Sequence, residues 1–423
     1  MARLFALIPF FLVPLALYAA DPLPRAKPEA VGMSSARLAR IEAAINAEIE
    51  KGRMPGAVIA VARKGKLVYY RAFGYLDKSA GTKMTTDAIF SIASMTKPMV
   101  AAGALELVEQ GKLQIEDPLP QYFPQFAKMQ VAVLRKDDTA GGAFDSVPAA
   151  RAITMRDLMT HTSGIIYGGR GSTAVHKLYP AGSSSAGTAM SGQEFLDKIA
   201  KNPLLHQPGT TWDYGFGLDV LGLVIEKISG QTLGQYLEGN LWKPLGMKDT
   251  AFNVPADKLN RYARALASDP DTGKPQSVLD LSKPLRFECG GGCAASSAAD
   301  YLRFAQMLLN GGQLDGKRLL GRKTVEYMLT NQLAPGVVNL IANADPTRAD
   351  MGFGLGLAVQ TTPGIVRTQG SVGSFSWPGA YGTNWFADPQ EQLAVVFMAQ
   401  TPGPIRWHYR YLVNTLVNQA IID

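Results

Sequence analysis

Ser94-Met95-Thr96-Lys97 places a hydroxyl and an amine three residues apart inside the largely apolar segment 88–108. If this segment is helical, positions i and i+3 share one face, so the Lys97 amine lies within hydrogen-bond reach of the Ser94 hydroxyl. Burial favours the neutral amine, which accepts or relays the serine proton. The four residues therefore predict a nucleophilic serine, Ser94, with Lys97 as its activating partner.

The motif by itself is short. Two fixed identities in four residues recur by chance in roughly one chain of this size, so a helix serine followed by a surface lysine is the alternative. Ser94 is the only serine in the chain with lysine at the third place after it. No Gly-x-Ser-x-Gly pentapeptide, the nucleophile signature of an α/β-hydrolase, occurs anywhere in the sequence.

The composition is that of a globular protein with a large core. The 423 residues are 47% hydrophobic and 18% charged, which fits one big domain or two subdomains. The net charge of +7 comes from Lys and Arg residues that are scattered singly or in pairs, so a nucleic-acid groove is not expected. The four histidines lie apart from the two cysteines, and we predict no metal and no cofactor.

The N-terminus predicts export. Arg3 precedes an apolar run over 4–18 that ends in Ala19-Ala20, which is typical of a signal peptide over residues 1–20. The mature protein would then be periplasmic or secreted; an uncleaved membrane anchor is the alternative. No later segment is long and apolar enough to span a bilayer, so no stable membrane span is expected after cleavage.

The two cysteines are Cys289 and Cys293, separated by three glycines. An oxidising compartment favours a disulfide, and glycines permit the tight loop that this bridge needs. The required Cα separation does not follow from sequence, so their pairing is left open.

The hydrophobic pattern predicts strands at both ends of the chain and helices between them. A helix is expected over 35–51, followed by a hairpin of strands at 57–62 and 67–73. After a mainly helical middle, strands are expected at 354–360, 365–368, 382–387 and 393–399, and a last helix over 406–421. Loops are expected at 136–148, 167–191 and 333–350, the second of them as a lid.

This order predicts an α+β fold, with an antiparallel sheet from N- and C-terminal segments flanked by helices and an inserted mainly helical subdomain. The folded domain would cover 28–421. Its sheet subdomain would comprise about 28–93 and 350–421, and its helical subdomain about 94–349. The crevice between the two parts is where a small molecule is expected to bind.

Further motifs follow the serine motif in a fixed order: His161-Thr162-Ser163-Gly164, Tyr214-Gly215-Phe216, Gly290-Gly291-Gly292 and Trp377-Pro378-Gly379-Ala380. With these motifs, the sequence from about Pro28 to the C-terminus resembles the serine β-lactamase superfamily. It is most similar to the family VIII carboxylesterases, which are similar to class C β-lactamases in fold but prefer short-chain esters.

The resemblance implies a role for each matching residue. Ser94 would be the nucleophile, Lys97 its activating partner, and Tyr214 the base or proton shuttle. The oxyanion would be held by the backbone N–H groups of Ser94 and Ala380. His161 lies in a turn that the superfamily uses structurally, so it is not expected to form a Ser-His-Asp triad.

Two departures from the β-lactamase pattern concern substrate binding. Phe216 stands where β-lactamases have asparagine, and a phenyl ring cannot make the hydrogen bonds of an amide. Trp377 replaces the lysine of Lys-Thr-Gly, which removes a cationic partner for a substrate carboxylate. We therefore expect Phe216, Trp377 and Gly379 to contact substrate and the two departures to favour neutral esters. Pro378 demands an edge strand or a bulge at this place.

The sequence as a whole predicts a serine hydrolase that cleaves short-chain carboxylic esters through an acyl-enzyme on Ser94, with acyl transfer to other alcohols as a variant. One alternative is a class C-like β-lactamase or a D-alanyl-D-alanine peptidase. A second is a non-catalytic module that binds cell-wall fragments or peptides. The expected partner is a small-molecule ester, and the oligomeric state is open.

Overall fold

The protein was analysed as a computed structural model that describes residues 21–135, 144–364 and 366–423. The predicted signal peptide, 1–20, lies outside the described residues. The α-helices are α1 Ser35–Leu38, α2 Arg40–Glu50, α3 Thr96–Glu109, α4 Met155–Thr160, α5 Ala174–Leu178, α6 Ser183–Ala189, α7 Gly192–Lys201, α8 Gly217–Ser229, α9 Leu233–Leu237, α10 Ala298–Leu309, α11 Arg322–Met328 and α12 Ile405–Asn418.

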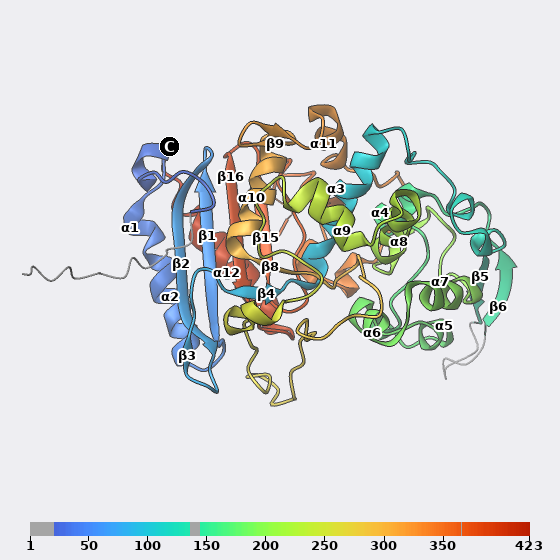
Figure 1. Cartoon of the computed structure of the whole chain (residues 1–423), viewed down its shortest axis with the longest axis horizontal. Helices are drawn as coiled ribbons and strands as arrows, with labels where there is room; N and C mark the ends of the chain where they lie inside the picture. Colours follow the sequence, from blue (N-terminus) through green and yellow to red (C-terminus); the bar gives the residue numbers. More distant parts are fainter. Residues whose placement is uncertain (1–20, 136–143, 365) are drawn as a thin grey trace, which may run out of the picture.

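Strands from both ends of the chain form one sheet (Figure 1). Among the described residues this sheet has eight strands in the order β12-β13-β14-β15-β16-β1-β2-β3. They are β1 Gly56–Arg63, β2 Lys66–Asp77, β3 Thr82–Lys83, β12 Gly352–Phe353, β13 Ala358–Val359, β14 Phe375–Ser376, β15 Asn384–Asp388 and β16 Leu393–Ala399. Because β1 pairs antiparallel with both β2 and β16, the predicted α+β fold with its antiparallel sheet from both termini is confirmed.

Short two-stranded pairs complete the described strands. They are β4 Ile89–Ser91 with β8 Ala295–Ser297, β5 Gln130–Leu134 with β6 Phe144–Pro148, β7 Thr211–Trp212 with β11 Val338–Asn339, and β9 Gln313–Leu314 with β10 Lys317–Arg318. The strand β4 ends at Ser91, just before Ser94 in the chain, and its pairing with β8 helps to fix the position from which α3 begins.

The central strands bury both of their faces. In β1, Val58 and Ala60 pack into one hydrophobic cluster while Ile59 and Val61 pack into another, as the two-residue period of a strand requires. The helices α1, α2 and α12 contribute to the second cluster, and α10 covers the opposite face (Figure 1). The sheet is therefore a middle layer. Because both faces of its central strands are buried, their sequences are continuously apolar and do not alternate between apolar and polar residues.

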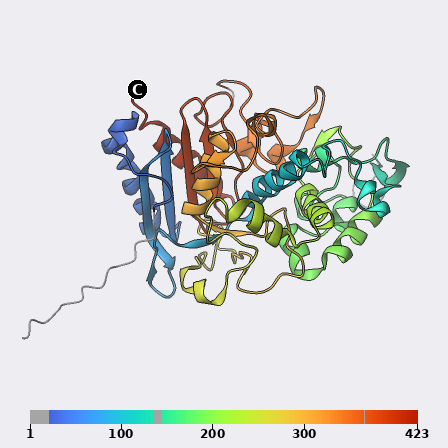
Figure 2. The same cartoon turned by 45° about the horizontal axis from the view of Figure 1, so that its top comes forward.

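The helix α3 begins at the active-site motif and runs between the sheet and the helical part of the molecule (Figure 2). It is apolar on nearly all sides, and it packs against α8 and α9. A helix that is hydrophobic all round is a core helix, so its position is strongly constrained. The helix α10, although within 94–349, packs on the sheet. The predicted division into subdomains at 94 and 350 stays a prediction.

Four local expectations differ from the structure. The stretch 167–191 is not a plain loop, because it contains α5 and α6; the side chain of Thr173 caps α5 by accepting the His176 N–H. The expected strand at 365–368 is absent from the described residues 366–368, where the chain instead approaches α12 and the Gln369 N–H donates to Asn414 Oδ1. Residue 365 itself is outside the described residues.

The expected loop at 136–148 is also only partly a loop. Residues 144–148 form β6, which pairs with β5, while 136–143 lie outside the described residues. The expected loop at 333–350 contains β11 and two short 3₁₀ turns, Ile341–Asn343 and Pro346–Arg348. Short paired segments of this length lack a readable hydrophobic period, which is why the sequence pattern misses them.

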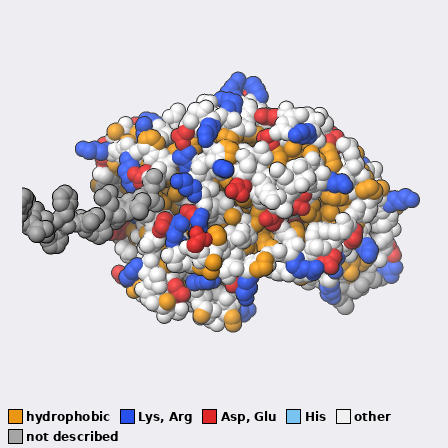
Figure 3. Space-filling view, viewed as in Figure 1, with side chains coloured by type: hydrophobic (Ala, Val, Ile, Leu, Met, Phe, Trp, Pro, Cys, Tyr) orange, Lys and Arg blue, Asp and Glu red, His pale blue; other side chains and the backbone are white. Residues whose placement is uncertain are grey.

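The surface shows no large area of one charge on the face drawn in Figure 3, where Lys and Arg side chains lie among Asp and Glu. Within the described residues, no helix is both long and apolar enough to cross a membrane.

Candidate active site

Ser94 lies at the mouth of a narrow cavity, just before the first turn of α3. Between residues 88 and 105 it is the one side chain that is not buried. The preceding Ala93 has a φ of 44°, a left-handed conformation that costs a non-glycine residue about 1–3 kcal/mol. This strained turn directs Ser94 towards the cavity, while Met95 and Thr96, the two middle residues of the motif, stay in the core.

Lys97 is fully buried beside Ser94. Its Nζ atom lies 3.4 Å from Ser94 Oγ and 3.2 Å from the Tyr167 hydroxyl, and it also donates to the carbonyl oxygen of Gly291. A neutral amine has two N–H groups and one lone pair. When the amine is in this neutral form and keeps its N–H groups on Tyr167 and Gly291, its lone pair is left for the Ser94 proton.

A buried network holds the acceptors of Lys97 in place. Tyr167 contacts the Ser183 hydroxyl at 2.8 Å and donates to Asp219 Oδ2 at 3.4 Å, and Ser183 donates to the same oxygen at 2.9 Å. The other oxygen, Oδ1, accepts the Gly291 N–H at 3.0 Å. Asp219 therefore fixes both Tyr167 and Gly291. Sequence reasoning missed Tyr167, Ser183 and Asp219, although an acid in the apolar run of α8 was a readable signal.

The Gly291 carbonyl that meets Lys97 belongs to a closed ring. Cys289 and Cys293 form a disulfide with a Cα separation of 5.3 Å, and both are fully buried. A Cβ on Gly291 would lie 2.1 Å from Asp219 Oδ2, so only glycine fits there. The sequence left this pairing open, and the structure shows that the bridge spans the loop against which Lys97 rests.

Tyr214 reaches the same cavity from the other side. Its hydroxyl accepts the indole N–H of Trp377 at 3.2 Å, and its ring lies 4.5 Å from Lys97 Nζ. His161 packs against the Tyr214 ring at 4.5 Å between centroids. Burial, followed by the charge on Lys97, lowers the pKa of His161 well below its usual value, so this histidine is a neutral packing partner.

Gly379 and Ala380 form the opposite rim. A Cβ on Gly379 would lie 2.4 Å from the Ile92 carbonyl oxygen, so this strand segment approaches the Ser94 turn as only glycine allows. Ala380 lines the cavity with Ser94, and its N–H has no hydrogen-bond partner among the described residues. An N–H with these properties suits the predicted oxyanion role, which stays a prediction.

Phe216 does not line the cavity. It is fully buried behind the site, where its ring packs edge-on against Tyr167 at 4.5 Å and against Phe195 at 5.2 Å. Its predicted contact with substrate stays a prediction, and the structure gives it the role of supporting Tyr167. Trp377, in contrast, lines the cavity with Pro378.

No group of three or more His, Cys, Asp or Glu side chains within 21–135, 144–364 and 366–423 is arranged to hold a metal ion.

The two tyrosines can be separated by matched substitutions. Tyr214 lines the cavity, so we expect Tyr214→Phe to lower kcat about 100-fold, at the low end for a lost proton-transfer group. Tyr167 acts through Lys97, so Tyr167→Phe should lower kcat about tenfold and shift the pH profile. Steady-state kinetics on one ester across pH measures both. A larger loss in Tyr167→Phe than in Tyr214→Phe would reverse these assignments.

The buried carboxylate predicts a pH dependence. Burial raises the pKa of Asp219 to about 6, while Lys97 and Ser183 act in the opposite direction. Protonation turns one oxygen into a donor, which weakens its bonds from Tyr167 and Gly291. We expect kcat/KM to fall as the pH drops below about 6. At neutral pH, the Asp219→Asn variant should already have the low kcat/KM that the unaltered protein shows at acidic pH. Asp300→Asn is the control, since burial raises the pKa of Asp300 to about 6 as well.

If the acidic limb persists in Asp219→Asn and disappears in Asp300→Asn, the assignment to Asp219 is wrong. Asp300 lies in the first turn of α10, accepts the Thr250 hydroxyl at 2.8 Å and has no hydrogen bond to Lys97, so its removal should leave the limb in place.

Comparison with known proteins agrees with this geometry. The family model described as Beta-lactamase matches residues 39–414. The chain belongs to the β-lactamase family. The serine motif at Ser94, the paired lysine and the sheet with its helical part are thus features of a β-lactamase-family serine hydrolase, and the predicted resemblance is confirmed.

Relatives within the β-lactamase family include esterases. The chain is 30% identical to Esterase EstB of Burkholderia gladioli, covering 88% of this chain and 93% of EstB. It is 38% identical to Protein Rv1367c of Mycobacterium tuberculosis, covering 85% and 89%. The solved structure of EstCE1, titled a hydrolase with promiscuous acyltransferase activity, superposes with a TM-score of 0.74 at 25% identity, covering 92% and 99%. The chain is therefore an esterase-like serine hydrolase of the β-lactamase family.

Proposed function

We propose that this protein is a carboxylesterase that cleaves short-chain esters through an acyl-enzyme on Ser94. The observation that carries the proposal is the 3.4 Å contact between Ser94 Oγ and the buried Nζ of Lys97, whose two other acceptors are fixed by the Asp219 network. Such an arrangement keeps the lysine lone pair on the serine hydroxyl, which is what activates a serine nucleophile.

Acylation follows from these positions. Ser94 Oγ attacks the ester carbonyl carbon while Lys97 takes its proton, and the N–H groups of Ser94 and Ala380 bind the oxyanion. The tetrahedral intermediate collapses as the C–O bond to the alcohol breaks. The alcohol leaves with a proton supplied from Lys97 through the Tyr214 hydroxyl. The products of this step are a Ser94 ester and a free alcohol.

Deacylation is the reverse with a new nucleophile. A water molecule loses its proton to the Tyr214 and Lys97 pair and attacks the Ser94 ester, which releases the carboxylic acid and restores the serine hydroxyl. Another alcohol in the same place would give a new ester. We include acyl transfer in the proposal because EstCE1, a structural relative, is titled with that activity.

Export belongs to the same proposal. The apolar run at 4–18 and the disulfide between Cys289 and Cys293 both suit a protein that works in an oxidising compartment.

The test compares two substrates on the purified protein. We expect turnover of p-nitrophenyl butyrate, little turnover of a chromogenic cephalosporin, and covalent labelling of Ser94 by a fluorophosphonate. Dominant cephalosporin turnover would favour the β-lactamase alternative. Labelling without turnover of either substrate would mean that the substrate class is wrong, and no labelling at all would support a non-catalytic binding module.

A further inference from the structure

Most of the charged side chains that line the cavity at Ser94 are positive. Arg170, Arg406 and Arg410 line it together with Ser94, whereas Asp345 is the one carboxylate among its described lining residues. Asp345 is already engaged, because Arg410 Nη1 binds it at 2.8 Å. The other two guanidinium groups, those of Arg170 and Arg406, have no ion pair with this carboxylate or with any other described one.

Arg406 occupies the first turn of α12. It donates to the carbonyl oxygen of Gly403, and its guanidinium lies 4.8 Å from the ring centroid of Trp407. Its Nε atom is buried without a hydrogen-bond partner, and no described carboxylate lies within ion-pair distance. Burial, followed by the charge of Arg410, lowers the pKa of Arg406 to about 10. A partly desolvated cation with an unused donor is unfavourable until an anion binds.

Arg170 lines the same cavity from a different segment, at the end of the 3₁₀ turn Gly168–Arg170. Its guanidinium lies over two aromatic rings, 4.9 Å from the centroid of Tyr214 and 5.9 Å from that of Tyr167. Aromatic faces hold a guanidinium plane without using its N–H groups. Among the described residues no acceptor binds these N–H groups, so they are available to a ligand.

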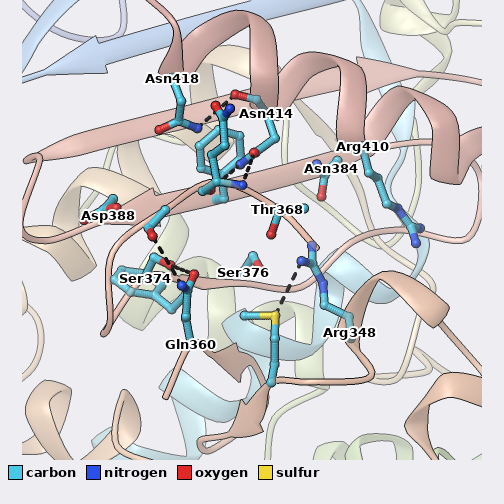
Figure 4. Close-up of a pocket in the computed structure, with 15 residues that line it drawn as sticks. Arg348, Gln360, Thr368, Ser374, Ser376, Asn384, Asp388, Arg410, Asn414 and Asn418 are labelled. Atoms are coloured by element: carbon cyan, nitrogen blue, oxygen red, sulfur yellow. Dashed lines mark hydrogen bonds between the residues drawn. The ribbon is translucent and has the colours of Figure 1, made fainter. Parts of the chain in front are cut away.

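The positive charge extends from this cavity to a neighbouring one. Arg410 also lines a small polar cavity with Arg348, and Figure 4 shows both arginines at one side of it. Arg348 is buried, lies 3.9 Å from Asp345 and has an unpartnered Nε. Arg410 is fixed by Asp345 and by the Gly379 carbonyl oxygen at 3.0 Å. Asp345 is thus shared by Arg348 and Arg410 at ion-pair distance. It acts on Arg406 only at longer range, so neither Arg170 nor Arg406 has an ion-pair partner of its own among the described residues.

We propose that the natural substrate is an ester that carries a free carboxylate, and that Arg170 and Arg406 bind this carboxylate while Ser94 attacks the ester. The proposal rests on the esterase function proposed above. A guanidinium binds a carboxylate through two parallel N–H bonds, and two arginines from different segments that line one cavity would hold the substrate carboxylate beside Ser94. This reverses the expectation of neutral esters drawn from Phe216 and Trp377, because the cations come from other segments.

The free volume of the cavity is about 20 Å³, which admits little more than a water molecule. Movement of a lining side chain would make room for an ester. Arg170 is the side chain best suited to do so, because glycines flank it at 169 and 171 and no hydrogen bond holds its guanidinium. The substrate carboxylate would draw this guanidinium off the Tyr214 ring.

The experiment uses two pairs of probes that differ in one charge. Monoethyl succinate against diethyl succinate places the carboxylate on the acyl side, and 4-carboxyphenyl butyrate against its methyl ester places it on the alcohol side. For each pair we measure the ratio of kcat/KM, charged over neutral. In at least one pair, Arg406→Gln and Arg170→Gln should each lower this ratio about 10- to 100-fold, as expected for a charge-assisted hydrogen bond.

Arg71→Gln is the matched control, because Arg71 is exposed and paired with Glu42 far from the cavity; its ratio should equal that of the unaltered protein. Calorimetry with Ser94→Ala supplies a readout that needs neither turnover nor arginine variants: a charged ester should bind at least tenfold more tightly than its neutral counterpart. Equal binding in this variant, or unchanged ratios in both arginine variants, would overturn the proposal. If p-nitrophenyl butyrate is not cleaved either, the esterase function fails as well.

Discussion

Ser94→Ala is expected to lower kcat/KM for p-nitrophenyl butyrate by at least about 10⁴-fold and to abolish labelling by a fluorophosphonate. The residual rate would come from the oxyanion donors and from binding, which do not depend on the hydroxyl. The substitution removes one oxygen from a partly exposed side chain, so the fold should be unaffected. The measurement is steady-state kinetics with mass spectrometry of the labelled protein.

Ser79→Ala serves as the control. Ser79 lies in an exposed turn, where its hydroxyl donates to Asp77 at 2.6 Å, and its removal should change neither activity nor labelling. Retention of more than about one hundredth of the activity in Ser94→Ala, with the label still bound elsewhere, would place the nucleophile at another residue.

Lys97→Met is expected to lower kcat by about 10³- to 10⁴-fold while changing KM little. Methionine fills much of the same buried space but cannot accept the Ser94 proton. The loss should be concentrated in acylation, so the burst of p-nitrophenol in the first turnover should slow in the same proportion. Rapid-mixing kinetics on p-nitrophenyl butyrate measures this step directly.

Lys83→Met is the matched lysine control, since the Lys83 ammonium lies 4.0 Å from the Tyr75 ring centroid on an exposed strand. Its activity should be unchanged. Because Lys97 also lowers the pKa of Asp219, its removal should move the acidic limb to higher pH. A Lys97→Met variant that keeps its fold by circular dichroism and loses less than tenfold in kcat would exclude Lys97 as the activating group.

The sequence alone predicted the parts of the site that depend on short-range order. Ser94 and Lys97 are one helical turn apart, so their contact follows from local geometry once the helix is accepted. The hairpin of β1 and β2 and the last helix were also predicted from local signals: short β-rich runs around a turn for the hairpin, and a helical apolar period for the last helix.

Contacts between distant segments were not predictable in this way. Tyr167 lies in what looked like the start of a loop, and Asp219 sits in an apolar helix with no sequence neighbour that indicates its role. Arg170 and Arg406 share a cavity although most of the helical part and the C-terminal strands separate them in the chain. Only the packed fold shows that two unpaired guanidinium groups face one serine.

The antiparallel pairing of β1 with β16 constrains how the chain can be made. The strand β1 stays without β16 until that much later strand has left the ribosome, and during that time its apolar faces and this edge are open to other chains. The complete sheet is a late event with high contact order, so folding should be slow relative to synthesis. A chain that is still unfolded after synthesis can also pass through a secretion channel.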